Sequence, residues 1–511
     1  MDSADQRKDM SQSQIEGLPE SQLAIHNQAA STDKECPEQA LSTDESTCAD
    51  KQTLTESSEH LSSVSSVKCS KSAQTRDKKP GLTRQILSLA LPTLGATIAE
   101  PLFLTIDSAM VGHLGAEKIA GMSLAMMIIN TVYGMSIFLA YSTTSLTGRH
   151  LGAGRRDLAL RSGVEAMWLA GGIGAVAAIL LAVFASPLLT WLGADAATLP
   201  HALAYLRSSA PGLIGMFVVL AATGTLRGFQ DTRTPLIAAS VGAAFNAVAN
   251  WALMYPLGLG VAGSGLGTAL TQTLMALFLG GIVARAAHRE GVSLKPSTYG
   301  LFASAAEGTP LLIRTIALRV ALLATLSAVT SISTQALAAH QIVWTLWSFA
   351  AYVLDALAIA AQALAGFASG TGQRGAMQPL LRTLSRWGLG FGAVVGVVLA
   401  LTAPWMSRIF TTDLTVIDYA TTAIIVSAFF QPVAGYVFLL DGILIGAGHG
   451  RYLAAASLLN LAVYAPVLWL IAHSSALASS PALALALVWL AYSAVYTGMR
   501  AFTNGYAART L

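Results

Sequence analysis

The chain has 511 residues, of which 54% are apolar and 11% are charged, and its mean hydropathy is +0.59. Soluble proteins carry about 25% charged residues, so water is not the only solvent of this chain. The formal net charge of +3 comes without a basic stripe or an aromatic-rich basic patch, which excludes a nucleic-acid partner. Cys36, Cys48 and Cys69 all precede residue 81, so the apolar part has no thiol for a disulfide, a metal cluster or a redox centre.

Residues 1–80 differ in composition from the rest of the chain. They hold 9 of the 30 Lys and Arg residues and 14 of the 27 Asp and Glu residues, with no apolar period. Such a segment cannot offset the entropy of ordering by burying apolar surface. It also lacks the early apolar run of a secretory signal. We therefore expect a disordered cytoplasmic tail over 1–80.

Long apolar stretches follow the tail, each able to cross a hydrocarbon core of about 30 Å. The first set is expected near 84–112, 118–147, 161–192, 199–226, 234–256 and 262–286. The second set is expected near 306–331, 335–370, 382–409, 415–445, 452–473 and 482–503. The predicted fold class is an all-α polytopic membrane protein with twelve transmembrane helices.

Positive charge is unevenly distributed between the two sides of these spans. Most Lys and Arg residues, including Arg149, Arg227 and Arg500, fall in loops or helix ends on the side of the tail. Lys and Arg bias short loops toward the cytoplasm. We therefore expect a multi-pass protein of the cell membrane with both termini cytoplasmic. The outer side keeps Lys118, Arg207 and Arg408.

The chain contains an internal repeat. A shift of 218 residues superimposes Pro92 on Pro310 and brings several glycines and arginines into register. Matches at one constant offset indicate two homologous halves of six spans each. An even number of spans gives both halves the same orientation, related by an axis along the membrane normal. We predict two pseudo-symmetric lobes, 81–295 and 296–511. The other matches include Gly148 with Gly366, Gly152 with Gly370, and Arg233 with Arg451.

Few ionisable residues lie inside the predicted spans. Each one costs at least about 2.5–3.5 kcal/mol in hydrocarbon and must face protein or water, so each is a candidate functional group. They are Glu100 and Asp107 in span 1, Arg314 and Arg319 in span 7, Asp355 in span 8 and Asp441 in span 10.

Glu100 and Asp107 are seven residues apart, so they share one face of a helix. A partly desolvated carboxylate whose surroundings change can bind a proton or a cation in turn, which is what proton-coupled antiport requires. The alternative for Asp107 and Glu100 is a structural hydrogen bond between helices. Arg314 and Arg319 are expected to neutralise these acids across the lobe interface, as a gating or a structural ion pair.

Asp355 and Asp441 have two interpretations each, as functional groups or as structural ion-pair partners of the arginines. The glycines that end spans 2 and 8, such as Gly148 and Gly366, resemble hinges or gates. No Walker, HExxH or nucleophile-elbow motif in a suitable setting occurs, so we expect no enzyme, no cofactor and no metal.

Several motifs resemble the multidrug and toxic-compound extrusion (MATE) transporters, especially the DinF-like branch. They are ALPTLGATIAEPLFLTIDSAMVGHLG (90–115), STTSLTGRHLGAG (142–154), TLRGFQDTRTP (225–235), LAAHQI (337–342) and AYVLDALA (351–358). The resemblance covers 84–503. It implies a V-shaped antiporter that exports organic, often cationic compounds against an inward flow of H⁺ or Na⁺. Asp107 matches the span 1 aspartate associated with proton coupling, and Arg314 matches a span 7 arginine.

The chain departs from the branch in span 5, where many members read Asn-x-x-x-Asp. Here the pattern is Asn246 and Asn250, so a second carboxylate of the N-terminal lobe is missing. Glu100 is a candidate substitute, and the two asparagines are candidates for a polar cavity. Oxygen ligands for Na⁺ are available from Asp355, Asn246 and Asn250.

The resulting prediction is a monomeric antiporter in the lipid bilayer that exports cationic or amphipathic organic compounds, driven by H⁺ in preference to Na⁺. The main alternative is a flippase for lipid-linked sugars from the related superfamily. Such proteins have more spans and a cationic cavity. The spans of this chain contain two arginines against four acids, which argues against a flippase. A channel or a membrane scaffold is disfavoured by the buried acids and the two-lobe repeat.

Overall fold

The computed structural model describes residues 81–373, 375 and 377–511, without the side chains of 100–104, 475 and 478. The predicted tail over 1–80 therefore lies outside the described residues. The described chain is helical throughout and contains no strand, as predicted. The described residues form one compact unit.

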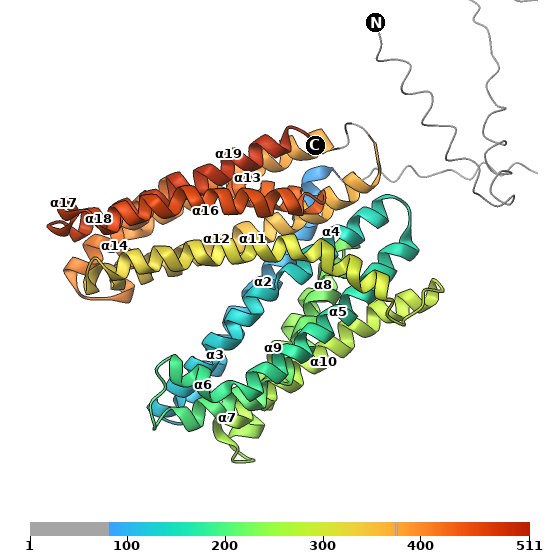
Figure 1. The fold of residues 1–511 in the computed structure, drawn as a ribbon, viewed down its shortest axis with the longest axis horizontal. Helices are drawn as coiled ribbons and strands as arrows, with labels where there is room; N and C mark the ends of the chain where they lie inside the picture. The colour runs from blue at the N-terminus through green and yellow to red at the C-terminus, as the bar shows by residue number, and fades with distance from the viewer. Residues whose placement is uncertain (1–80, 374, 376) are drawn as a thin grey trace, which may run out of the picture. The chain divides into compact units, whose positions relative to one another are not determined.

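The first repeat folds into nine helical segments (Figure 1). They are α2 Leu82–Gly112, α3 Ala116–Ser136, α4 Phe138–Gly152, α5 Arg156–Val183, α6 Ala185–Trp191, α7 Leu199–Ser209, α8 Gly212–Gly228, α9 Arg233–Met254 and α10 Gly260–Arg289.

The second repeat begins after a linker that contains the predicted lobe boundary at 295. Its segments are α11 Thr298–Thr330, α12 Thr334–Gly370, α13 Met377–Phe410, α14 Leu414–Phe429, α15 Gln431–Gly446, α16 Gly450–Ala472, α17 Ser475–Ala478, α18 Pro481–Leu490, the π-helix η1 Ala491–Tyr496 and α19 Thr497–Ala508.

Nine described helices are long and apolar enough to span a bilayer, or eleven when each of two bent pairs counts as one span. The first predicted span corresponds to α2, which is 31 residues long and is not among the eleven. The bent pairs are α7 with α8, at 50°, and α14 with α15, at 53°. These two pairs occupy the predicted spans 199–226 and 415–445, and the bend within each was not foreseen. Each break adjoins a proline, Pro211 or Pro432, whose missing N–H weakens the helix.

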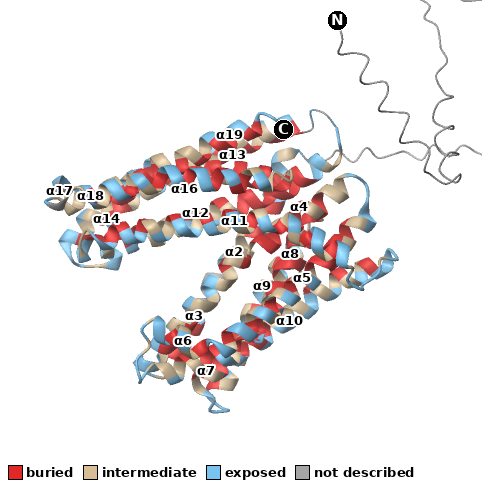
Figure 2. Ribbon diagram, viewed as in Figure 1, coloured by how far each residue is buried: buried red, intermediate tan, exposed pale blue. Residues whose placement is uncertain are grey.

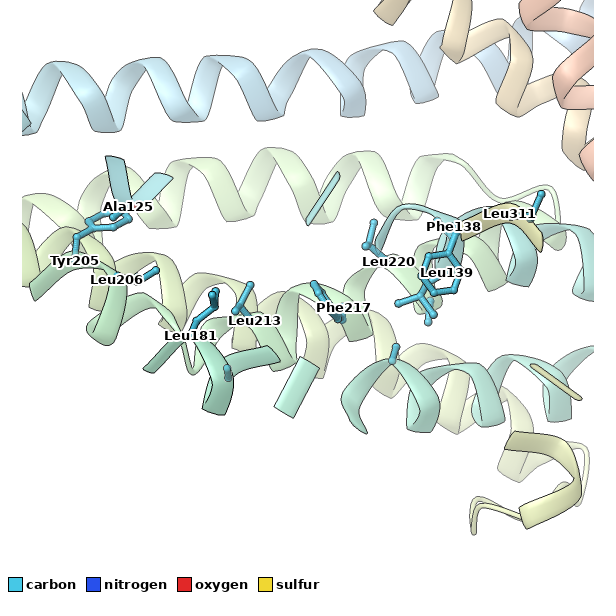
Figure 3. Packing of buried hydrophobic residues seen from close by; sticks show 14 of the residues in the cluster. Ala125, Phe138, Leu139, Leu181, Tyr205, Leu206, Leu213, Phe217, Leu220 and Leu311 are labelled. Carbon is cyan, nitrogen blue, oxygen red and sulfur yellow. The ribbon is translucent and has the colours of Figure 1, made fainter. Parts of the chain in front are cut away.

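The helices of each repeat gather into one bundle, and the first helix of each repeat starts in the opposite bundle (Figure 1). The start of α2 packs in the second bundle, where Ile86 and Leu89 join a core with residues of α12, α13, α15 and α19. Correspondingly, Leu311 of α11 packs in the core of the first bundle, beside Phe138 and Leu139 of α4 (Figure 3). This arrangement follows from the repeat, because α2 and α11 occupy equivalent positions in the two halves.

Burial follows the sides of the helices that face one another, and it is dense where α4, α8 and α12 meet (Figure 2). Exposed apolar side chains occupy the outward faces, as on α13, where Leu401 is 67% exposed and Trp405 is 63% exposed. In water such a surface is unfavourable, whereas lipid tails solvate it. The structure is therefore that of a membrane protein whose outer helical faces contact the hydrocarbon.

Candidate functional site

Asp107 is buried inside the first bundle. Its side chain is 1% exposed, and it accepts hydrogen bonds from three other helices. Ser264 Oγ on α10 donates over 2.5 Å and Asn250 Nδ2 on α9 donates over 2.9 Å. Tyr205 on α7 donates through its hydroxyl over 3.4 Å. The carboxylate thus connects α2 with α7, α9 and α10.

The two asparagines of α9 extend this network. Asn246 and Asn250 are one helical turn apart, and Asn250 Nδ2 also donates to Asn246 Oδ1 over 2.8 Å. Asn246 Nδ2 in turn donates to Thr268 Oγ1 over 3.4 Å. The Oδ1 atom of Asn250 is buried and has no hydrogen-bond partner among the described residues. The predicted polar pair therefore directly contacts the predicted coupling carboxylate.

Asp107 has no ion-pair partner in the part of the chain that the structure describes. Among the described residues, none of the ion pairs involves this carboxylate. The expected pairing of Arg314 with Asp107 across the lobe interface is wrong, because Arg314 bonds to another acid. Glu100 lies on α2, but its side chain is outside the described set.

Asp441 on α15 is that acid, and it forms the centre of a buried cluster in the second bundle. Arg314 on α11 donates to it over 2.6 Å, and Arg500 on α19 also donates to the same oxygen, Oδ2. Asn504 Nδ2 donates to the other oxygen over 2.6 Å. All four residues are buried, at most 9% exposed. One carboxylate here serves two guanidinium groups, so the cluster carries an excess positive charge.

Asp355 on α12 lies at the junction of the bundles. Its Oδ1 accepts a hydrogen bond from the Tyr141 hydroxyl of α4 over 3.2 Å. Gln362, two turns further along α12, donates to the backbone carbonyl of Tyr141 over 2.7 Å. Arg227 and Arg314 both interact electrostatically with Asp355. No hydrogen bond among the described residues joins Asp355 to Asn246 or Asn250, with which it was expected to offer Na⁺ ligands.

Two cavities meet at the Tyr141–Asp355 pair. The N-terminal cavity, of about 270 Å³, is lined mainly by the first bundle and includes Arg227 and Tyr205. The C-terminal cavity, of about 230 Å³, is lined mainly by the second bundle. Tyr141 and Asp355 line both. A hydrogen bond between the bundles thus separates two adjoining hollows.

Arg319 lines the C-terminal cavity without a partner. It is exposed, and within the described residues it forms no hydrogen bond and no ion pair. Its guanidinium lies against Gly134 of α3, where any side chain on the glycine would collide with it. It therefore reaches the first bundle, as expected, but it does not meet Asp107.

Glycines bring the bundles into close contact at the ends of α4 and α12. Gly148 faces Gly366, and a methyl group at Gly152 would overlap the Phe367 carbonyl. The contact is reinforced by an ion pair between Arg149 of α4 and Glu307 of α11. The glycine motifs singled out in the sequence thus form an interface between bundles rather than bends within helices.

Sequence reasoning missed part of both networks. Tyr205 and Ser264 were not identified, because a hydroxyl on a membrane helix has no diagnostic spacing. Arg227 and Arg500 were assigned only to the inner loops and ends, and their position in the cavity linings was missed. The 218-residue repeat gave no signal for either arginine, because the matching positions in the other half do not hold arginine.

Comparison with known proteins places these features in one family. The MatE family model matches residues 92–252 and again 310–470, two segments separated by the same 218 residues as the repeat. DETOXIFICATION 44, a chloroplastic protein of Arabidopsis thaliana, is 31% identical over 428 residues and is aligned over 80% of each chain. DNA damage-inducible protein F of Escherichia coli is 28% identical over 410 residues, which cover 78% of this chain and 88% of that protein.

Solved structures agree at the level of the fold. The Vibrio cholerae MATE transporter VcmN in its bent form superimposes with a TM-score of 0.75 at 20% identity, covering 84% of this chain and 96% of that chain. A MOP superfamily transporter from Pyrococcus furiosus gives a TM-score of 0.73 at 18% identity, with coverage of 84% and 95%. The twelve-helix fold class, the resemblance to DinF-like proteins and the expectation of a transporter rather than an enzyme are confirmed. The chain belongs to the MATE family of multidrug efflux transporters.

Proposed function

We propose that this transporter is an antiporter that exports small amphipathic organic compounds against an inward flow of protons, with Asp107 as the coupling carboxylate. The observation that carries the proposal is a carboxylate 1% exposed with no ion-pair partner among the described residues. An isolated buried charge is costly, and a proton is the smallest species that removes it.

The hydrogen-bond partners of Asp107 suit both of its protonation states. The hydroxyl groups of Ser264 and Tyr205 donate to the carboxylate and can equally accept from a neutral carboxyl group. The Asn250 amide donates through Nδ2, and its Oδ1 atom has no partner among the described residues. An ionised aspartate at position 250 could accept hydrogen bonds but could not donate one to Asp107. Asparagine at this position therefore matches a site that exchanges a single proton.

Na⁺ is the second candidate coupling ion, and the network disfavours it. A hard cation needs several oxygen ligands. The Oδ1 atom of Asn246 already accepts from Asn250, and the Ser264 hydroxyl directs its proton toward the carboxylate. Three of the donors around Asp107 would have to turn before a cation could bind.

Alternating access would require the two bundles to separate at the glycine interface. With the tail in the cytoplasm, this interface lies at the inner end of the bundles, so the described conformation blocks inward access. Opening inward breaks the contact of Gly148 with Gly366 and the Arg149 ion pair with Glu307. That pair is 28% and 30% exposed, which makes its rupture inexpensive, at about 0–1 kcal/mol.

We place the protein in the cell membrane as a monomer with both termini cytoplasmic. The excess of Lys and Arg on the side of the tail supports this orientation. Labelling of single cysteines introduced at Arg155 and at Asp413, on opposite sides, with an impermeant thiol reagent in intact cells tests it. Cysteine at 413 should react in intact cells and cysteine at 155 only after lysis, in a background without the native cysteines.

The experiment for coupling uses everted membrane vesicles with an acidic lumen, which should take up an efflux dye from the medium. An imposed proton gradient should drive transport and a Na⁺ gradient alone should not. Asp107→Asn should abolish proton-driven transport at normal protein level, because asparagine cannot bind a proton. The matched control is Asp418→Asn, an exposed aspartate on α14. Full proton-driven transport by Asp107→Asn, or Na⁺-driven transport without a proton gradient, would refute the proposal.

A further inference from the structure

The C-terminal cavity has no part in the coupling chemistry proposed for Asp107. It adjoins the N-terminal cavity at Tyr141 and Asp355, so a molecule moving between the bundles meets it. At about 230 Å³ it is smaller than a typical drug-sized site of roughly 300–1,000 Å³ and matches one or two fused rings.

Positive charge dominates the described lining of this cavity. Three arginines, Arg314, Arg319 and Arg500, face two acids, Asp355 and Asp441. The Asp441 carboxylate is shared by Arg314 and Arg500. Arg319 keeps all its donors free of hydrogen bonds within the described residues. The N-terminal cavity adds Arg227 and shares Asp355, so the described residues of the two linings include four arginines and two acids.

Arg319 is well suited to hold an anion. A guanidinium group offers five donors in a planar fork that matches the geometry of a carboxylate or a sulfonate. Facing hydrocarbon it would be costly, and its place at a cavity wall indicates that water or a ligand compensates it. The lack of an acidic partner distinguishes it from Arg314 and Arg500.

A second, independent feature of the cavity is an unsatisfied hydroxyl. Tyr496 is 1% exposed, lines the cavity, and its OH has no hydrogen-bond partner among the described residues. Buried tyrosine hydroxyls usually find a partner. Tyr496 belongs to the π-helix η1, a rare element that is frequent at functional sites. Tyr492 of the same element also lines the cavity.

Aromatic rings form one part of this wall. Trp347 and Tyr492 meet edge to face with their centroids 5.4 Å apart, and Tyr492 stacks on Tyr496 at 5.7 Å. Flat rings at such a wall favour a flat ligand, which gains contact area with little loss of conformational freedom. The charge of Arg319, the unsatisfied hydroxyl of Tyr496 and the aromatic rings therefore all favour the same kind of ligand.

We propose that the C-terminal cavity binds aromatic organic anions, with the anionic group on Arg319 and the ring against Trp347 and Tyr492, so that the exported compounds include aromatic carboxylates or sulfonates. Export of these compounds rests on the proposed antiport function, whereas their binding does not. The proposal replaces the expectation of cationic substrates that the sequence alone favoured.

The test compares two probes with one ring system and opposite charge, naphthalene-2-sulfonate and naphthalen-2-ylmethyl-trimethylammonium. Binding to the full-length protein in detergent is measured by titration calorimetry. The wild type should prefer the anion. Arg319→Gln should weaken anion binding about tenfold or more, the effect of losing one hydrogen bond to a charged group, and leave cation binding unchanged or stronger.

Three further variants make the test specific. Arg319→Lys should restore much of the anion binding, because it keeps the charge. Tyr496→Phe should weaken the binding about fivefold through loss of one neutral hydrogen bond. Arg408→Gln removes an exposed arginine of the same bundle outside the cavity and should change nothing. Tryptophan fluorescence checks that each variant is folded.

Cation binding tighter than anion binding in the wild type would overturn the proposal. Unchanged anion affinity in Arg319→Gln, or an equal loss in Arg408→Gln, would also overturn it. Asp107→Asn separates the two levels of the account, since it should lose proton-driven export and keep anion binding. Retained export in this variant refutes the coupling role and leaves the anion site standing.

Discussion

The Asp441 cluster leads to a prediction about relative stability. Two guanidinium groups, from Arg314 and Arg500, share the Asp441 carboxylate, and Asn504 donates to its second oxygen. Removing the acid leaves two buried cations side by side. Removing Arg500 leaves one acid and one base, which is a neutral pair. Asp441→Asn should therefore destabilise the protein more than Arg500→Gln, although both change a single charge.

The magnitudes follow from burial. Breaking a buried ion pair by removing one partner costs about 3–5 kcal/mol, and Asp441→Asn does this for two cations at once. Arg500→Gln loses about one hydrogen bond to a charged group, about 1.5–3 kcal/mol. For a unit of about 430 residues, each kcal/mol shifts the melting temperature by roughly 1 °C, so Asp441→Asn should lower it by about 3–5 °C or more.

The assay is thermal unfolding in detergent, followed by tryptophan fluorescence. Trp347 and Trp489 lie in the ring cluster beside these residues and report on this bundle. The double variant Asp441→Asn with Arg500→Gln should be more stable than Asp441→Asn alone, because it removes one of the two uncompensated cations. If Asp441→Asn unfolds at the same temperature as Arg500→Gln or above it, the excess-charge argument is refuted.

Two other predictions concern the interface and the coupling network. Gly152→Val should arrest transport at normal expression, because its side chain would overlap the Phe367 carbonyl and the bundles could not close at this end. Crosslinking between cysteines placed at 148 and 366 should fall in parallel, and efficient crosslinking would contradict the prediction. Asn250→Asp should shift the pH dependence of vesicle transport, because it places a second carboxylate about 2.9 Å from that of Asp107. An unchanged pH profile would argue against proton exchange at this network.

The architecture was largely predictable from the sequence. Hydropathy located the spans, and the offset between Pro92 and Pro310 is the offset between the two segments that match the MatE model. The start of α2 and of α11 in the opposite bundle was not predictable, because hydropathy reports that a helix crosses the membrane and not which helices it contacts. The bends at Pro211 and Pro432 had a local signal in the missing N–H donor.

The candidate sites were predictable as residues but not as contacts. Asp107 and Asn250 were both identified, yet their hydrogen bond depends on the relative rotation of α2 and α9. Arg227 and Arg500 were placed among the inner loops and ends, because each lies near the end of a span. Their long side chains carry the guanidinium several ångströms from the backbone, which brings it to a cavity wall. The charge balance of the cavities was therefore misjudged.

Proton release on substrate binding tests the central claim, exchange of a proton for substrate at Asp107, most directly. Purified protein in weakly buffered detergent solution is mixed with a transported compound, and a pH-sensitive dye records the change. The account predicts that the wild type releases protons in proportion to the bound substrate and that Asp107→Asn binds the same compound and releases none. Equal proton release by the wild type and Asp107→Asn would contradict it.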